Sequence, residues 1–286
     1  MPRGQRFLDH RYRYACHYTL SYKGHSVLSY DLEVNITMIS LVIAEAAIET
    51  VPVQIIDHPS VRNHAKRMGR RSNETLLDRS YHHSAMVHAD LKSEWKRGRP
   101  DIAHFALMEA LSTPLFLRRR LNVYLHTIND NLISIGENVR IPKSYFRFES
   151  LMIDLFKKKV IKAYNGAGIS DEANNDKHKD NTNKNILLQL HEDMTFSKVI
   201  QKMIQPSTLI GLSTAGVQKT AQSIVEESLT ADNTNCAFVI GGFARGHFSN
   251  DTTAVIKRLY SITDYRLEAH VVIARIIYEC EKVLHM

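Results

Sequence analysis

Long apolar runs and cysteines are both scarce in this chain of 286 residues. A membrane-spanning helix needs about 18 or more apolar residues in a row, and the longest candidate, residues 36–47, is shorter and carries Glu45. The start of the chain is basic, aromatic and histidine-rich, whereas a signal peptide needs an apolar core. We therefore expect no membrane partner and a protein that works inside the cell.

The three cysteines are too few and too widely spaced to form a framework. Cys16, Cys236 and Cys280 suggest neither a disulfide network nor a zinc knuckle. His82 and His83 are adjacent, so they cannot share one helix face, and no third ligand stands at metal spacing. We expect no bound metal and assign these histidines to a polar turn or to a supporting role behind residues that contact a ligand.

Charge and length narrow the class of protein further. The formal net charge is +7, and 44% of the residues are hydrophobic, enough for a substantial core. A basic chain suits a polyanionic partner, most simply nucleic acid, although a merely soluble basic protein has the same composition. The length allows one large domain or two small ones.

Apolar runs alternate with amphipathic stretches from residue 36 onward. The runs at residues 121–128 and 131–136, joined by Asn129-Asp130, predict a β-hairpin. Alternating strands and helices predict an α/β fold with a mostly parallel sheet, to which the hairpin and the helix after it are an insertion. The other predicted strands lie at 36–43, 75–77, 186–190, 208–213, 236–240 and 258–262. The predicted helices lie at 44–51, 60–72, 102–111 and 195–203 and from residues 148 and 267 onward, and residues 214–227 are predicted as a loop and a helix.

Two stretches do not follow this alternation. Residues 164–185 are rich in Asn, Asp and Lys and predict a flexible polar segment. Such an insertion is tolerated cheaply within one domain, so we expect a single domain over residues 35–286. Residues 1–34 lack clear periodicity and are an N-terminal extension of uncertain order.

Glycines follow the predicted strand at 236–240. Gly241, Gly242 and Gly246 let the backbone take a positive φ and let a ligand approach closely, and ligands of open α/β sheets bind at the carboxyl ends of strands. A second loop, at Thr263-Asp264, follows the next strand. A plain strand-to-helix turn uses the same residue types, so both interpretations stay open. The spacing is not G-x-G-x-x-G, which argues against a nicotinamide dehydrogenase.

A series of ordered motifs resembles the Nep-type (Emg-type) ribosome-biogenesis methyltransferases, which are SPOUT-class enzymes. The RGRPDIAH and Arg-Ile-Pro motifs are specific to this family, whereas the strand–glycine loop is common to many SPOUT enzymes. The resemblance runs from residue 39 to the C-terminus through LVIAEAAIETVP, LLDRSYHHSAM, RGRPDIAH, NVYLHT, VRIPKSYFRFESLMIDL, VIGGFARG and ITDYRLEA.

The resemblance implies a fold, a reaction and a set of partners. The fold would be a SPOUT α/β domain with a C-terminal trefoil knot, assembled as a homodimer. The reaction would be transfer of a methyl group from S-adenosylmethionine to N1 of a pseudouridine in small-subunit ribosomal RNA, as a step of ribosome biogenesis. We expect it in the cytoplasm, or in the nucleolus if the source is a eukaryote. The implied cofactor-binding residues are Leu212, Gly241, Gly246, Ile262, Thr263, Asp264, Tyr265, Arg266 and Leu267.

The same motifs imply catalytic and RNA-binding residues. Asp101 would orient N1–H of the pseudouridine and partly accept its proton, and Arg99 would stabilise the charge that develops on the ring. The alternative for this pair is a salt bridge at a helix end. The RNA-binding residues would be Arg99, Arg140, Lys143 and Arg147.

The chain departs from the family pattern at two of these positions. Lys143 stands where arginine is common, which keeps the charge but loses the planar fork. Arg266 follows Tyr265 where proline is usual. Two other functions stay open beside N1 methylation: a SPOUT methyltransferase of different specificity, and a non-catalytic assembly factor that binds ribosomal RNA.

Overall fold

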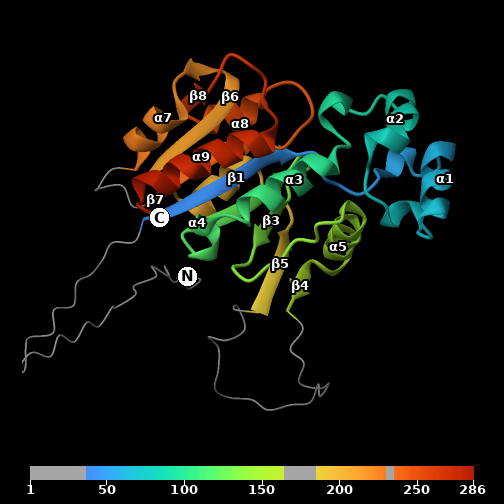
Figure 1. Cartoon of the computed structure of the whole chain (residues 1–286). Coiled ribbons are helices and arrows are strands. Elements are labelled where there is room, and N and C mark those ends of the chain that lie inside the picture. Colours follow the sequence, from blue (N-terminus) through green and yellow to red (C-terminus); the bar gives the residue numbers. More distant parts are fainter. Residues whose placement is uncertain (1–36, 164–184, 230–234) are drawn as a thin grey trace, which may run out of the picture. The chain divides into compact units, whose positions relative to one another are not determined.

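A mixed β-sheet forms the centre of the computed structural model, which describes residues 37–163, 185–229 and 235–286 (Figure 1). Within these ranges the sheet has eight strands in the order β4-β5-β3-β2-β1-β7-β6-β8. Residues from Thr37 onward form one compact unit. The predictions for residues 1–34 and for nearly all of 164–185 lie outside the described residues. Among the described helices none is both long and apolar enough to cross a lipid bilayer.

Five neighbouring strands are parallel. β1 (Met38–Ala46) lies between β2 (Leu121–Thr127) and β7 (Asn235–Gly241), and β7 is followed by β6 (Thr208–Gln218) and β8 (Arg258–Ser261). The central strands are nearly continuous apolar runs, as expected of strands that are covered on both faces. The predicted α/β fold with a mostly parallel sheet is confirmed. The trefoil knot stays a prediction.

The other three strands are antiparallel and form one side of the sheet. β3 (Leu132–Ile135) pairs with β2 as the predicted hairpin. β5 (Ile186–His191) pairs with β3, and β4 (Val160–Lys162) pairs with β5. The helix α5 (Tyr145–Lys158) connects β3 to β4. The predicted hairpin-and-helix insertion is therefore present.

Side-chain alternation along β1 and β7 divides the core between the two faces of the sheet. Ile39, Leu41 and Ile43 face a cluster built with α3 (Pro100–Ala110), α5, α7 (Ala221–Ser228) and α9 (Ala269–Val283). Val42 and Ala44 face the opposite cluster, which includes α6 (Phe196–Lys198), the π-helix Val199–Ile204 and Phe248. The short helix α8 (Asn250–Val255) contacts α6. Figure 1 shows α3 and α9 side by side over one face.

A small helical arm follows β1. α1 (Pro59–Arg67) and α2 (Arg79–His88) pack on each other, with the 3-10 turns Val53–Ile55 and Ser72–Glu74 before each of them. Another 3-10 turn, Glu94–Lys96, leads to α3, and α4 (Pro114–Leu117) follows α3. The arm has its own buried apolar cluster, which includes Val51, Leu77 and Met86. We call residues 58–88 the α1–α2 arm.

Three local predictions were wrong. The helix predicted at residues 44–51 is absent: β1 continues to Ala46 because Ala44 pairs with Gly241, and Glu45 has a φ of +51°. The predicted polar turn around His82 is the helix α2, because Asp78 caps it by accepting a hydrogen bond from the Ser80 amide at 2.8 Å. The strand predicted at 75–77 is reduced to a single bridge between Thr50 and Leu76.

Candidate active site

A pocket of about 250 Å³ lies at the carboxyl ends of β6, β7 and β8. Three segments that are separate in sequence enclose it, namely the bulged part of β6, the glycine loop after β7, and the loop between β8 and α9. Arg99 and Ile102, from the start of α3, complete the wall. This is the end of the sheet where open α/β proteins bind their ligands.

Eight of the nine predicted cofactor residues line this pocket. Asp264 is the exception, and its side chain is exposed to solvent. The eight are Leu212, Gly241, Gly246, Ile262, Thr263, Tyr265, Arg266 and Leu267. Ser213, Phe243, Ala244 and Arg245 also line the pocket and belong to the loops that the family resemblance implies for the cofactor. The sequence had not indicated Thr214 and Glu268, which line it as well.

The glycines of the loop after β7 are required by close packing. A Cβ on Gly241 would lie 2.7 Å from Cε1 of Phe243, and a Cβ on Gly242 would lie 2.7 Å from Cγ2 of Ile43 and 2.9 Å from Cα of Ala46. Gly246 has a φ of +91°, which side-chain-bearing residues rarely adopt. The loop therefore offers its backbone groups directly to the pocket.

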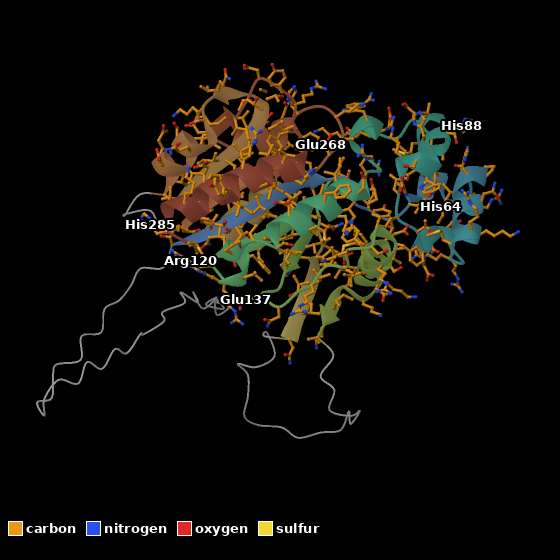
Figure 2. All side chains as sticks on the ribbon, in the orientation of Figure 1. His64, His88, Arg120, Glu137, Glu268 and His285 are labelled. Atoms are coloured by element: carbon orange, nitrogen blue, oxygen red, sulfur yellow. The ribbon has the colours of Figure 1, made fainter. Side chains whose placement is uncertain are left out.

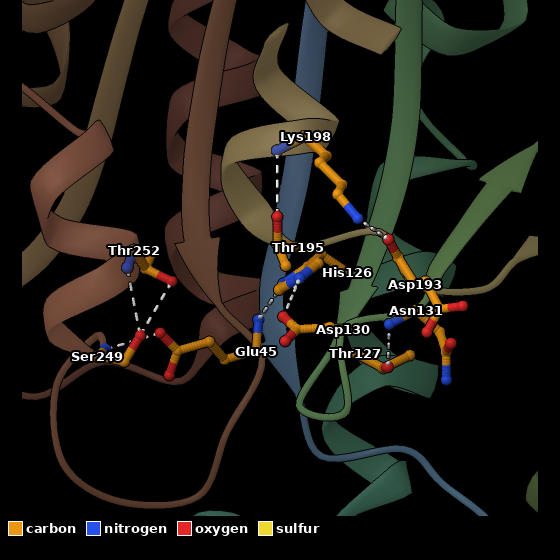
Figure 3. Close-up of polar contacts among 10 residues, drawn as sticks. All are labelled: Glu45, His126, Thr127, Asp130, Asn131, Asp193, Thr195, Lys198, Ser249 and Thr252. Carbon is orange, nitrogen blue, oxygen red and sulfur yellow. Dashed lines mark hydrogen bonds and ion pairs between the residues drawn. The ribbon is translucent and has the colours of Figure 1, made fainter. Parts of the chain in front are cut away.

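Glu45 and Lys96 contact this loop on the side away from the pocket, and neither residue lines the pocket. Glu45 accepts the Lys96 ammonium at Oε2 (2.6 Å) and the backbone N–H of Ser249 at Oε1 (2.7 Å). Nζ of Lys96 also lies 4.4 Å from the ring centroid of Phe243. Burial raises the pKa of the Glu45 carboxyl, but hydrogen bonds from Lys96 and Ser249 outweigh it, so that this pKa lies below its usual value. Figure 3 shows Glu45 reaching toward Ser249.

His126 supports the backbone of Glu45 from the neighbouring strand. Its Nδ1 accepts the Glu45 amide hydrogen at 3.4 Å, so in the neutral ring Nε2 carries the proton and donates it to Oδ1 of Asp130 at 3.2 Å (Figure 3). Burial lowers the pKa of His126, and Asp130 opposes that shift. A larger cavity of about 550 Å³ adjoins this network but contains none of the predicted cofactor residues.

Arg99 and Asp101 form a two-pronged ion pair at the pocket. Arg99 Nε lies 2.8 Å from Asp101 Oδ1, and Arg99 Nη2 lies 2.7 Å from Oδ2. Pro100 between them starts α3, and the amide of Arg99 donates to the Ala47 carbonyl at 3.3 Å, which fixes the pair to the end of β1. Hydrogen bonding to Asp101 raises the pKa of Arg99. Both side chains are partly exposed, 40% and 32%.

A second carboxylate stands near this pair. Asp78 accepts a hydrogen bond from the Tyr145 hydroxyl at 3.3 Å, which joins the start of α5 to the start of α2. Burial, with the charges of Asp78 and Glu149 after it, raises the pKa of Tyr145, so the phenol stays protonated. Nε2 of His104 on α3 lies 2.7 Å from the Pro142 carbonyl oxygen. The Arg-Ile-Pro segment is therefore held beside α2 and α3.

The other predicted RNA-binding residues lie on this segment and the first turn of α5. Arg140, Lys143 and Arg147 are exposed, and their side chains form no hydrogen bond or ion pair with the described residues. Arg99 lines the pocket, and the other three belong to the surface that the His104–Pro142 and Tyr145–Asp78 contacts hold next to it. Across the described ranges, no three His, Cys, Asp or Glu side chains group in a way that would hold a metal ion.

These features define an α/β enzyme whose ligand pocket is built from backbone loops of a parallel sheet. A family model described as "EMG1/NEP1 methyltransferase" matches residues 41–281, and the chain belongs to this family. The resemblance seen in the sequence is confirmed, and the chain is a methyltransferase.

The chain is also similar to two curated archaeal proteins, each named "Ribosomal RNA small subunit methyltransferase Nep1". It is 33% identical to that of Staphylothermus marinus, over 87% of this chain and 97% of the relative. It is 32% identical to that of Saccharolobus solfataricus, over 86% and 98%.

A solved structure matches over most of both chains. The crystal structure of Archaeoglobus fulgidus Nep1 bound to S-adenosylhomocysteine has a TM-score of 0.70 and 28% identity. It covers 88% of this chain and 100% of the Archaeoglobus chain. S-adenosylhomocysteine is what remains of S-adenosylmethionine after methyl transfer, which agrees with the predicted methyl donor.

Proposed function

We propose that this protein transfers the methyl group of S-adenosylmethionine to N1 of a pseudouridine in small-subunit ribosomal RNA, during ribosome biogenesis. The observation that carries the proposal is the Arg99–Asp101 pair at a pocket lined by the glycine loop. The family, the names of the archaeal relatives and the S-adenosylhomocysteine bound to the Archaeoglobus protein support it. We also propose that it works in the cytoplasm, or in the nucleolus if the source is a eukaryote.

The pocket suits a methyl donor that is held mainly through backbone groups. A Cβ on Gly241 would collide with the ring of Phe243, Gly246 takes a positive φ, and Leu212, Ile262 and Leu267 provide apolar walls. When bound there, S-adenosylmethionine supplies an electrophilic methyl carbon on a sulfonium sulfur. Asp264 is outside the pocket, so we propose no contact between its side chain and the donor.

The protein's own residues must position N1 and manage its proton. N1 of pseudouridine carries a hydrogen, so it is a poor nucleophile until that hydrogen is drawn away. Both oxygens of Asp101 accept hydrogen bonds from Arg99, which fixes the orientation of the carboxylate beside the pocket that Arg99 lines. Asp101 therefore orients N1–H and accepts its proton as the N–C bond forms, while Arg99 stabilises the negative charge on the ring.

The RNA must present the base outside its stack. Enzymes that modify bases extrude the target nucleotide or take it from a loop. We propose that Arg99, Arg140, Lys143 and Arg147 hold the phosphates around it. With four such contacts, the logarithm of the affinity for single-stranded RNA should fall with the logarithm of the salt concentration at a slope of roughly −3.

A homodimer is part of the proposal. Two apolar residues at the start and in the middle of the last helical segment are used within the protein itself, because Leu267 lines the pocket and Ile276 is buried. Three large apolar side chains remain exposed on α3, α4 and α9, and α9 contacts both of the other helices: Phe105, Leu117 and Tyr278. We propose this surface as the dimer interface.

A methyl-transfer assay tests the proposal. The purified protein receives radiolabelled S-adenosylmethionine and two RNA hairpins that differ only in having pseudouridine or uridine in the loop. We expect label on the pseudouridine hairpin alone, because N1 of uridine is bonded to the sugar. Label on both hairpins would indicate another SPOUT specificity. Label on neither, with RNA binding retained and S-adenosylhomocysteine binding absent by calorimetry, would indicate an assembly factor.

A further inference from the structure

We propose that the α1–α2 arm is a second RNA-binding surface, which binds the phosphate backbone of the RNA flanking the target loop. This inference rests on the proposed function and extends it to a part of the chain outside the pocket. Between His58 and Arg71 the chain carries five arginine and lysine residues and no acidic residue. A cluster of one sign of charge on a short helical unit is the electrostatic pattern of a polyanion-binding surface.

Most of these cations are available to a partner. Arg62, Lys66, Arg67 and Arg71 are exposed, and none of them forms an ion pair with the described residues. The lysine run at the end of α5 differs, because its charges are already neutralised nearby. Lys157, Lys158 and Lys159 pair with Glu74, Asp154 and Glu192 at 2.7–3.2 Å. The arm is thus distinguished from this lysine run by a cluster of four exposed cations that have no ion-pair partner among the described residues.

Arg67 is held in place without losing its hydrogen-bond donors. Its Cζ lies 5.5 Å from the ring centroid of Tyr81, and Tyr81 stacks on His64 with ring centroids 3.9 Å apart and planes 12° apart. A cation–π contact orients a guanidinium, but its N–H groups remain free for a phosphate. Figure 2 marks His64 on the arm.

The arm is firmly joined to the surface that carries Arg140, Lys143 and Arg147. Arg70 is the link: Nη1 lies 3.1 Å from Glu149 Oε2, and Nη2 donates to Ser150 Oγ at 2.6 Å, both on α5. Its Cζ also lies 5.6 Å from the ring centroid of Phe146. The hydrogen bond between Asp78 and Tyr145 is a second link. An RNA bound at the start of α5 therefore has the arm as its immediate neighbour.

The charge pattern selects RNA over an acidic protein as the partner. Arg62 and Lys66 stand four residues apart, so they project from one face of α1 about 6 Å apart along the helix. Arg67 adds a third charge at the end of the same helix. A regular row of cations beside a second basic surface suits a regular polyanion, and the proposed substrate is one.

Salt-dependent binding to two RNAs tests the proposal. One RNA is a minimal pseudouridine hairpin, and the other adds a single-stranded tail on each side. The test variant is Arg62→Gln/Lys66→Gln/Arg67→Gln in the full chain. The matched control is Lys202→Gln/Lys257→Gln/Arg258→Gln, which removes the same charge from exposed cations that have no ion-pair partner among the described residues.

The salt slope is the slope of the logarithm of RNA affinity against the logarithm of salt concentration, and each phosphate contact on a single strand adds about 0.7 to its magnitude. Since the arm variant loses three such contacts, we expect its slope on the tailed RNA to be smaller in magnitude than the wild-type slope by about 2. The ratio of the wild-type affinity to the variant affinity for the tailed RNA should then fall by about 16-fold between 50 and 200 mM salt. The control should keep the wild-type slope. If the triple variant does not fold, Arg62→Gln/Lys66→Gln changes two side chains that have no ion-pair partner among the described residues, and it should lower the slope by about 1.4.

An arm variant with the wild-type slope on the tailed RNA, or a control variant with an equal loss, would overturn the proposal. Methyl transfer is measured separately on the minimal hairpin, where the arm variant should keep the wild-type rate. Failure of the wild type to methylate that hairpin would contradict the proposed reaction. The salt slopes would still report on the arm, so the two failures are distinguishable.

Discussion

His82 donates a hydrogen bond from Nε2 to Nδ1 of His64 across 3.0 Å, inside the α1–α2 arm. The direction follows from the backbone, because the Asp78 amide donates to His82 Nδ1 at 3.1 Å and leaves the ring proton on Nε2. Both rings are buried and neutral. Burial lowers the pKa of His64, and burial together with His64 lowers the pKa of His82 to about 4.

We predict that this pair makes the protein less stable in mild acid. A histidine whose pKa is lower in the folded than in the unfolded state binds fewer protons when folded, so its contribution is complete above the unfolded pKa of about 6.5. It is lost as the pH falls from there toward about 4. Urea unfolding at intervals between pH 7 and 4.5 measures it. His82→Phe should flatten the dependence, and His83→Ala, on the exposed side of α2, should not.

His82→Phe should also lower the free energy of unfolding at pH 7. It leaves the Asp78 amide and His64 Nδ1 without a partner, at a cost of about 1–3 kcal/mol. Removal of the exposed His83 side chain should change the stability by less than about 0.5 kcal/mol. Equal losses for the two variants would contradict the hydrogen-bonded pair.

Lys96→Met should weaken cofactor binding as well as stability. It leaves the Glu45 carboxylate, whose side chain is 8% exposed, without its cation, which costs about 3–5 kcal/mol. It also removes the ammonium next to Phe243 in the glycine loop. Calorimetric titration with S-adenosylhomocysteine measures the binding. Adding Glu45→Gln should recover part of the stability, since no unpaired charge then remains.

The exposed pair Arg119–Glu137 is the control for this experiment. Its side chains are 51% and 44% exposed (Figure 2 labels Glu137), so Arg119→Ala should cost less than about 1 kcal/mol. S-adenosylhomocysteine affinity should be unchanged. A similar loss of affinity in both variants would show that Lys96 has no particular effect on the loop.

Asp101→Asn should separate the chemical step from cofactor binding. The amide keeps the shape but is a poor proton acceptor, so methyl transfer should slow by about 100-fold or more. Arg99→Lys should show a comparable loss because lysine cannot reproduce the two-pronged contact. S-adenosylhomocysteine affinity should stay within a few-fold of wild type for Asp101→Asn. A normal single-turnover rate would contradict its proposed role.

Gly246→Ala should impair the cofactor pocket, with Gly69→Ala as its matched control. Both glycines have positive φ, +91° and +64°, so alanine should destabilise each variant by about 1 kcal/mol. Only Gly246 lines the pocket. S-adenosylhomocysteine affinity should fall for Gly246→Ala and stay normal for Gly69→Ala. Loss of affinity in both would mean that general stability, and not the loop, controls binding.

The sequence predicted the sheet and the position of the glycine loop because both depend on local patterns, whereas the individual pocket residues were implied by the family resemblance. Residues 236–240 form a continuous apolar run followed by glycines, and the β-hairpin has its turn residues in place. The prediction from sequence failed around Glu45. The alanine-rich stretch there favoured a helix, but Ala44 pairs with the distant Gly241, so that β1 continues through this stretch. A glutamate inside an apolar run was the available signal for a buried ion pair. Its partner Lys96 lies 51 residues away, and no spacing rule connects the two.

The order of the strands also affects how the chain can be made. One edge of β1 pairs with β7, whose residues are synthesised about 200 positions later. At typical elongation rates this edge therefore stays unpaired for about 10–40 s. Until then a long apolar strand has one open side in a nascent chain. An unpaired strand edge of this kind invites aggregation. Any fragment that stops before Asn235 would retain that exposed edge permanently, so expression of the first half alone should yield insoluble material.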